Sequence, residues 1–186
     1  MLQILFLECL LFIFTPNAAA PSQEANNLSS WEQTGIQALL AVKWNWETFP
    51  SGWKIFFHSE SEAYLGQTNY DLKQIDIWVS SRQTLEQVAA IIAHEFAHVF
   101  DQLYLTDSLR REWLRARKIP AKTPWWYQKE SRHDYRSGIG DFAECVSWTV
   151  QEGTGKFRSL LGPPPNKLQQ ALIRKWLSTL SKKKNL

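Results

Sequence analysis

Apolar and polar residues recur with two different periods along this chain, and the change of period separates helices from strands. Between about Gln83 and Leu105, apolar residues are spaced three and four apart, as on the buried face of an α-helix. These apolar positions are Leu85, Val88, Ala89, Ile92, Phe96, Val99 and Leu103. Residues 75–79 instead alternate at a period of two, which predicts a strand just before the helix.

The same periods predict the other elements of the chain. Helices are expected over residues 31–46, 106–118, 141–150 and 166–180, and further strands over residues 53–58 and 63–67. We expect the strand at 75–79 to lie at the sheet edge, and Ser80 with Gln83 to cap the long helix. The sequence therefore predicts an α+β domain in which a short mixed sheet packs on the long helix, with further helices around it.

The N-terminus has the pattern of a targeting segment. Leu2 to Phe14 is almost continuously apolar, and Ala18-Ala19-Ala20 is typical of a signal-peptide cleavage site. The run is too short for a comfortable membrane span. We predict a signal peptide over residues 1–20 and a secreted or extracytoplasmic protein. No Lys or Arg precedes the apolar run, so an uncleaved N-terminal anchor stays open as an alternative.

Composition indicates one globular domain over residues 31–186, after a flexible leader over residues 21–30. The 186 residues are 44% hydrophobic, and 21 Lys and Arg stand against 18 Asp and Glu. This net charge of +3 favours anionic partners only weakly. The basic residues of the helix at 106–118 are therefore interpreted as a solvated face, and no nucleic-acid partner is predicted. Cleavage would leave Cys145 as the one cysteine, so no internal disulfide is expected.

The chemistry of the chain is concentrated in His94-Glu95-Phe96-Ala97-His98, which reads H-E-x-x-H. Four residues are little more than one helical turn, so His94 and His98 project from the same helix face. Two imidazoles placed in this way suit a zinc ion with an open coordination position. Glu95 lies beside them, where it can hold a metal-bound water and take its proton. The motif predicts a zinc site with Glu95 as general base.

Two histidines hold zinc poorly without a third protein ligand. The predicted helix at 141–150 offers Asp141 and Glu144, which are three residues apart and share one face. Carboxylates among the apolar residues of that helix are costly unless they are paired or bound to a metal. We therefore predict Glu144 as the third ligand, with Asp141 as the alternative.

The motif, with Asp101 three residues after it and Phe142-Ala143-Glu144 on a later helix, resembles the glutamate-type zincin metallopeptidases. The closest resemblance is to the group around anthrax lethal factor and the Pro-Pro endopeptidases. It covers about 60 residues in two short blocks. In that group the zinc-binding glutamate stands at the position that Gly140 occupies here, which leaves the third ligand to Glu144 or Asp141.

The resemblance implies a small zincin-like metallopeptidase domain and a tyrosine that stabilises the oxyanion. Tyr135 is the nearest candidate, followed by Tyr127 and His133, and Asp101 is expected to support the motif helix or a histidine. The predicted function is a secreted, monomeric zinc endopeptidase that acts on peptides or proteins, without stable membrane insertion after signal cleavage. The alternative is a catalytically inactive, zinc-stabilised binding domain at the cell surface.

Overall fold

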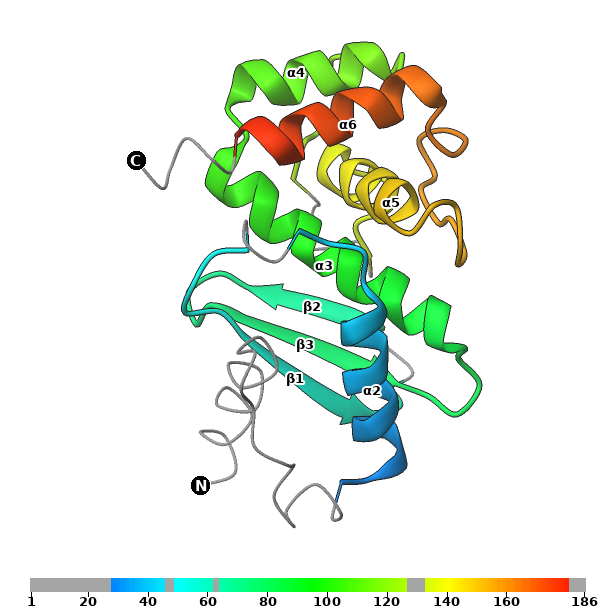
Figure 1. Ribbon diagram of the computed structural model, residues 1–186. Coiled ribbons are helices and arrows are strands. Elements are labelled where there is room, and N and C mark those ends of the chain that lie inside the picture. Colours follow the sequence, from blue (N-terminus) through cyan, green and yellow to red (C-terminus); the bar gives the residue numbers. More distant parts are fainter. Residues whose placement is uncertain (1–27, 46–48, 62–63, 127–132, 181–186) are drawn as a thin grey trace.

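The computed structural model describes residues 28–45, 49–61, 64–126 and 133–180, which form an α+β fold (Figure 1). These residues contain five helices and three strands. The helices are α2 (Ser30–Ala41), α3 (Leu85–Tyr104), α4 (Asp107–Ala116), α5 (Gly138–Val150) and α6 (Lys167–Thr179), and the strands are β1 (Lys54–Ser59), β2 (Gly66–Asn69) and β3 (Gln74–Val79). The predicted α+β class, with a short mixed sheet and a long helix, is confirmed.

The sheet has the order β1-β3-β2, with β3 parallel to β1 and antiparallel to β2. The expectation that β3 forms the edge is therefore wrong. Ile75, Ile77 and Val79 all point into the core, and this apolar side of β3 packs under α2 and α3. The strand beside α3 at the edge is instead the short β2.

Helix α3 passes between the sheet and α5 through the middle of the molecule (Figure 1). It begins at Leu85, and its capping box is formed by Thr84 and Gln87 rather than by Ser80 and Gln83. Gln83 instead accepts a hydrogen bond from the Ser80 N–H within the preceding turn, at 2.7 Å. Because α3 is covered on two sides, most of its residues from Val88 to Asp101 are buried, including every motif residue except His98, which is half-buried.

Two other boundaries differ from the sequence-based expectation. Helix α2 ends at Ala41, before the predicted end at residue 46, and α5 begins at Gly138 instead of Asp141. The Ser137 side chain caps α5 by accepting from the Gly140 N–H, so the two glycines that suggested a loop belong to the first turn.

The predicted signal peptide and most of the predicted leader lie outside the described residues, so secretion stays a prediction. Ser29, near the end of that leader, caps α2 through a capping box with Glu32. In the described part of the chain, every helix is too short or too polar to cross a membrane.

Candidate metal centre

Helix α3 brings the two motif histidines together as the sequence predicts. The Nε2 atoms of His94 and His98 lie 3.1 Å apart, and the two ring centroids are 4.9 Å apart. A ligand atom of Glu95 lies within 4.8 Å of ligand atoms of both histidines. All three side chains are largely enclosed, since α3 lies between β2 and α5.

A third group, which sequence reasoning missed, completes this cluster. Asp134 precedes α5, and its Oδ2 atom lies 3.1 Å from His98 Nε2 and 3.4 Å from His94 Nε2. A tetrahedral zinc ion with bonds of 2.0–2.1 Å holds its ligand atoms about 3.3 Å apart. The three atoms already have the mutual spacing of ligands around one such ion.

The buried oxygen of Asp134 has no well-directed hydrogen bond. Its Oδ2 atom is enclosed, and no donor among the described residues meets it with hydrogen-bond geometry, although both imidazoles are close. A buried polar atom in this state is uncommon in folded proteins and calls for an explanation. A cation bound between the three groups would satisfy it.

The electrostatics of the cluster are those of a carboxylate facing two imidazoles. Burial alone would lower the pKa of His94, but the negative charge of Asp134, and then the hydrogen bond and charge of Glu144, raise it well above its usual value. Burial likewise opposes ionisation of Asp134, yet His94 and then His98 hold the pKa of that carboxyl well below its usual range. The negative charge of Asp134 therefore stabilises a positive charge next to it, whether a proton on His94 or a bound cation carries that charge.

Gly140 provides the space for Asp134. A Cβ atom built at this position would lie 2.2 Å from the Asp134 carbonyl oxygen and 2.7 Å from its side-chain Cγ. Any side chain at position 140 would displace the segment that carries Asp134. The glycine is thus required by the close approach of this segment to the first turn of α5.

Glu144 does not lie where the sequence placed it. Its Oε1 atom is 3.0 Å from His94 Nδ1, the ring nitrogen opposite the one that faces His98, and its Oε2 atom accepts from the Arg158 N–H at 2.6 Å. Both oxygens are therefore engaged on the far side of the His94 ring. The prediction that Glu144 is the third ligand does not hold in this geometry, which instead has it orient the His94 ring.

Asp141, the alternative ligand, is part of a buried network away from the histidines. It forms two hydrogen bonds with the Arg117 guanidinium, at 2.8 and 2.9 Å, and accepts from the Trp113 indole N–H and the Ser159 hydroxyl. Its side chain is 0% exposed and that of Arg117 is 2% exposed. The prediction of Asp141 as a ligand does not hold either, because its oxygens bind α4 and the segment after α5.

Replacing Arg117 with alanine is expected to destabilise the protein by about 3–5 kcal/mol, because the buried Asp141 carboxyl group would lose its charged partner. Chemical denaturation of wild type and variant measures this loss. The exposed neighbour Lys118, replaced with asparagine, is the control and should change stability by less than about 0.5 kcal/mol. An equal loss of stability in both variants would show that the buried Arg117–Asp141 pair contributes no more to stability than an exposed side chain does.

Glu95 is positioned by the edge strand. Its Oε2 atom accepts from the Thr68 hydroxyl at 2.7 Å. Gly66 lies on the same side of β2, and a Cβ atom there would approach Glu95 Oε1 to 2.5 Å and Cγ to 2.8 Å. Strand β2 therefore positions the Glu95 carboxylate beside the cluster. The Thr68 hydroxyl binds it, and the absence of a side chain at Gly66 leaves room for it.

Changing Gly66 to alanine should push the Glu95 carboxylate out of place and leave the three metal-facing atoms unchanged. If the protein is a hydrolase, we expect its turnover to fall about 100-fold, as displacements near 1 Å can cause. Metal content should stay as in the wild type. The matched control is Gln67→Ala, an exposed position on the same strand, and a similar loss in that variant would contradict the assignment.

Two tyrosines feel the charges of the cluster and its surroundings. The Tyr135 ring is edge-on to His94, with centroids 6.0 Å apart, and burial followed by the charges of Glu144 and Asp134 raises its pKa, against the opposing charge of Arg158. Tyr70, which follows β2, was not predicted. Its pKa is raised by burial and then by the charges of Asp101, Glu95 and Asp134.

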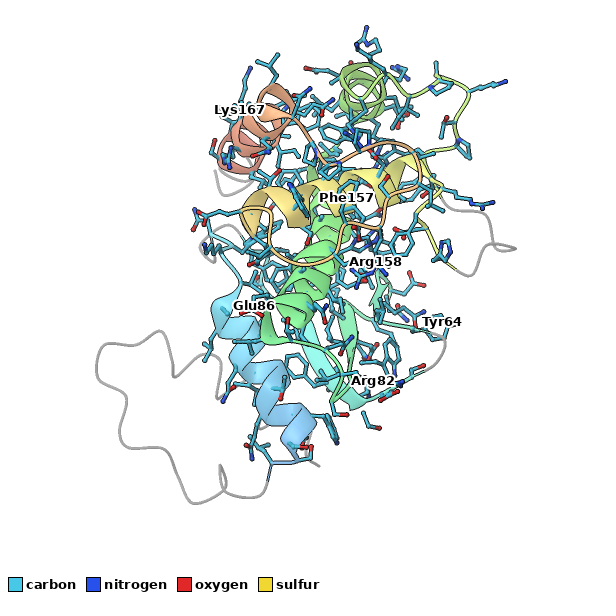
Figure 2. The ribbon with its side chains drawn as sticks, turned by 90° about the vertical axis from the view of Figure 1, so that its right-hand side faces the viewer. Tyr64, Arg82, Glu86, Phe157, Arg158 and Lys167 are labelled. Atoms are coloured by element: carbon cyan, nitrogen blue, oxygen red, sulfur yellow. The ribbon has the colours of Figure 1, made fainter. Side chains whose placement is uncertain are left out.

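The remaining candidates take other places. His133 stacks on Tyr135 with centroids 4.8 Å apart, and Tyr127 lies outside the described residues. Asp101 is fully buried, receives two hydrogen bonds from the Arg110 guanidinium and one from the Trp125 indole, and so ties α3 to α4 and the segment before α5. Figure 2 shows Arg158 between α5 and the sheet, on the same side of the molecule as Tyr64.

Comparison with known proteins identifies no relative of this chain. No protein-family model matches the chain, and neither the curated proteins nor the solved structures give a match. The resemblance in the two short sequence blocks therefore stays a prediction, and any function is argued from the site itself.

Proposed function

We propose that this protein is a metal-dependent peptidase whose metal ligands are His94, His98 and Asp134. The observation that carries the proposal is the triangle formed by the two Nε2 atoms and Asp134 Oδ2, with sides of 3.1, 3.1 and 3.4 Å. Two neutral imidazoles and one carboxylate, with a fourth position left open, are the donor set of catalytic zinc sites. Zinc is accordingly the proposed metal.

The residues around the triangle suit hydrolysis. A zinc ion bound there would act as a Lewis acid and would lower the pKa of a coordinated water. Glu95, held by Thr68 and covered by no side chain at Gly66, takes the proton of the attacking water and delivers it to the leaving amine. Tyr135, whose ring packs edge-on against His94, is the phenol proposed to donate to the carbonyl oxygen under attack.

The positions of Asp134 and Gly140 reconcile the site with the zincin resemblance. The similar group binds its metal through a glutamate at the position of Gly140, and here the Asp134 segment occupies the space beside that glycine. We propose that the ligand carboxylate comes from the loop before α5 instead of from the helix. Glu144 then orients His94, as carboxylates often do for metal-bound histidines.

Strand β2 suggests how a substrate binds. Among the described strands it pairs with β3 alone, so its other edge offers backbone donors and acceptors beside Glu95. An extended peptide that adds to this edge would bring one of its carbonyl groups to the cluster. This arrangement favours an endopeptidase acting on extended segments of peptides or proteins.

The test is digestion of a peptide library by the zinc-loaded protein, with and without a chelator. We expect cleavage that the chelator stops and that added zinc restores. Stoichiometric zinc without cleavage of any peptide would favour the alternative of an inactive, zinc-stabilised binding domain. Absence of tight zinc binding would reject both functions.

A further inference from the structure

Positive charge is concentrated on one layer of the molecule. The residues of α4, α6 and the segment after α4 (107–123 and 166–180) contain nine Lys and Arg against two Asp and Glu, a net charge of +7. The remaining described residues contain seven Lys and Arg against eleven Asp and Glu, a net charge of −4. The modest overall charge therefore hides a strong separation of charge between two parts of the fold.

Most of the cations in this layer are exposed and have no acidic partner. Two of the nine are taken up by ion pairs, because Arg110 binds Asp101 and Asp107, and Arg117 binds Asp141. The other seven form no ion pair with the described residues. Six of them, Arg111, Arg115, Lys118, Lys122, Lys167 and Lys175, are together called the basic face. The seventh, Arg174, instead lines a hollow with Lys43 and Glu152.

The basic face lies opposite the sheet. Figures 1 and 2 both show α4 and α6 on the side of α5 that points away from the strands, and Lys167 projects outward there in Figure 2. The two helices are joined by hydrogen bonds from Gln169 to the Ala116 carbonyl and from Arg117 to Gln169. The two helices that carry the basic face are therefore held together by direct hydrogen bonds.

We propose that the basic face docks the protein peripherally on an anionic lipid bilayer. Clustered Lys and Arg are attracted to acidic head groups, and this attraction reaches over about one Debye length, roughly 8–10 Å at 0.1–0.15 M salt. Leu168 stands in the same surface, next to Lys167, and at 82% it is the most exposed large apolar side chain of the described residues. An exposed leucine among cations suits the boundary between head groups and acyl chains.

The same face is poorly suited to nucleic acid. Single strands are held by aromatic side chains on which bases stack. Trp113 and Trp176, the tryptophans of α4 and α6, are both buried in the core. The helix pair therefore offers cations and a leucine but no exposed tryptophan of its own. The exposed Trp126 lies over Arg110, which is paired with Asp101 and Asp107 and is outside the basic face, so a lipid surface is favoured over an RNA or DNA strand.

Docking through this layer would also orient the candidate metal centre. His94, Glu95 and His98 lie on α3 beside β2, on the sheet side of α5, where the net charge is negative. An anionic surface attracts the basic face and repels the larger part of the molecule, which carries the cluster. The cluster would then face the aqueous phase, where it stays open to soluble or surface-exposed chains.

Co-sedimentation with vesicles tests the proposal without any requirement for catalysis. The full chain and a chain beginning at residue 21, which keeps every described residue, are mixed with phosphatidylcholine vesicles containing 0 or 30% phosphatidylglycerol. We expect the chain that begins at residue 21 to bind the anionic vesicles at least tenfold more tightly than the neutral ones. The difference should shrink at 0.5 M NaCl and persist in the presence of a chelator. The full chain measures what the apolar run Leu2–Phe14 adds to binding of either kind of vesicle.

Two variants of equal charge change locate the surface. Arg111→Gln/Arg115→Gln should weaken binding to the anionic vesicles about tenfold or more, whereas Lys54→Gln/Lys156→Gln, exposed cations outside the basic face, should change it less than twofold. Leu168→Gln should weaken binding severalfold with no change in net charge. Equal loss in the two double variants, equal binding to neutral vesicles, or binding to single-stranded RNA in preference to lipid would each overturn the proposal.

Discussion

Replacing Glu95 with glutamine should lower peptide hydrolysis by about 10²–10⁴-fold while zinc content stays near one ion per chain. The amide keeps the size of the side chain and can still hydrogen-bond Thr68, but it cannot accept a proton from the attacking water. Turnover of a cleaved library peptide and metal analysis of the same preparation measure the two quantities together.

The matched comparison for this variant is His94→Ala. It should lose both the metal and the activity, because His94 Nε2 is one corner of the proposed ligand triangle. If the glutamine variant also lost its metal, Glu95 would be a ligand or a structural residue and the proposed proton transfer would be wrong. Undiminished hydrolysis would reject it as well.

Removing the Asp134 carboxylate is expected to have the largest effect on metal affinity. In Asp134→Ala the site keeps only two imidazoles, and we expect zinc to be lost to a competing chelator at concentrations that leave the wild type loaded. Glu144→Gln should weaken zinc binding only about 10–100-fold, the usual cost of losing a carboxylate that orients a metal-bound histidine. Competition with a fluorescent zinc chelator measures both affinities.

The order of these two effects decides between the sequence-based and the structure-based assignments. Asp134 Oδ2 faces both Nε2 atoms, whereas Glu144 reaches the opposite nitrogen of His94. Complete loss of zinc in Glu144→Gln, together with nearly full affinity in Asp134→Ala, would restore Glu144 as the ligand. Circular dichroism of each variant shows whether the fold is kept.

The parts of the fold that depend on local pattern could be predicted from the sequence. The long helix and the approach of His94 to His98 follow from spacings of three and four residues along one segment, and the α+β class follows from these spacings together with the period-two alternation of the strands. The position of Glu95 beside the histidines follows from the same helix geometry. These features need no knowledge of the rest of the chain.

The third group of the cluster could not be predicted in this way. Asp134 lies on a loop 36 positions after His98, and its place depends on the packing of that loop against the first turn of α5 at Gly140. The one available signal was the glycine itself, since a residue without a side chain leaves room for a neighbour. Glu144 and Asp141 share a predicted helix face, but they bind different partners in the fold. Glu144 contacts His94, whereas Asp141 is bound by Arg117.

The edge strand shows the same limit. Strand β3 alternates in sequence as an edge strand can, yet β1 and β2 pair on both of its sides because β2 folds back through the turn after Asn69. Sheet order is set by pairing between segments distant in the chain, which the period of a single strand does not encode. Only the structure shows that β2, and not β3, holds Glu95.

Anomalous diffraction from crystals grown with zinc, at the zinc absorption edge, tests the central claim most directly. The proposed site predicts one strong peak within about 2.2 Å of His94 Nε2, His98 Nε2 and an Asp134 carboxylate oxygen. A peak ligated by Glu144 in place of Asp134, or no peak near the two imidazoles at saturating zinc, would contradict it.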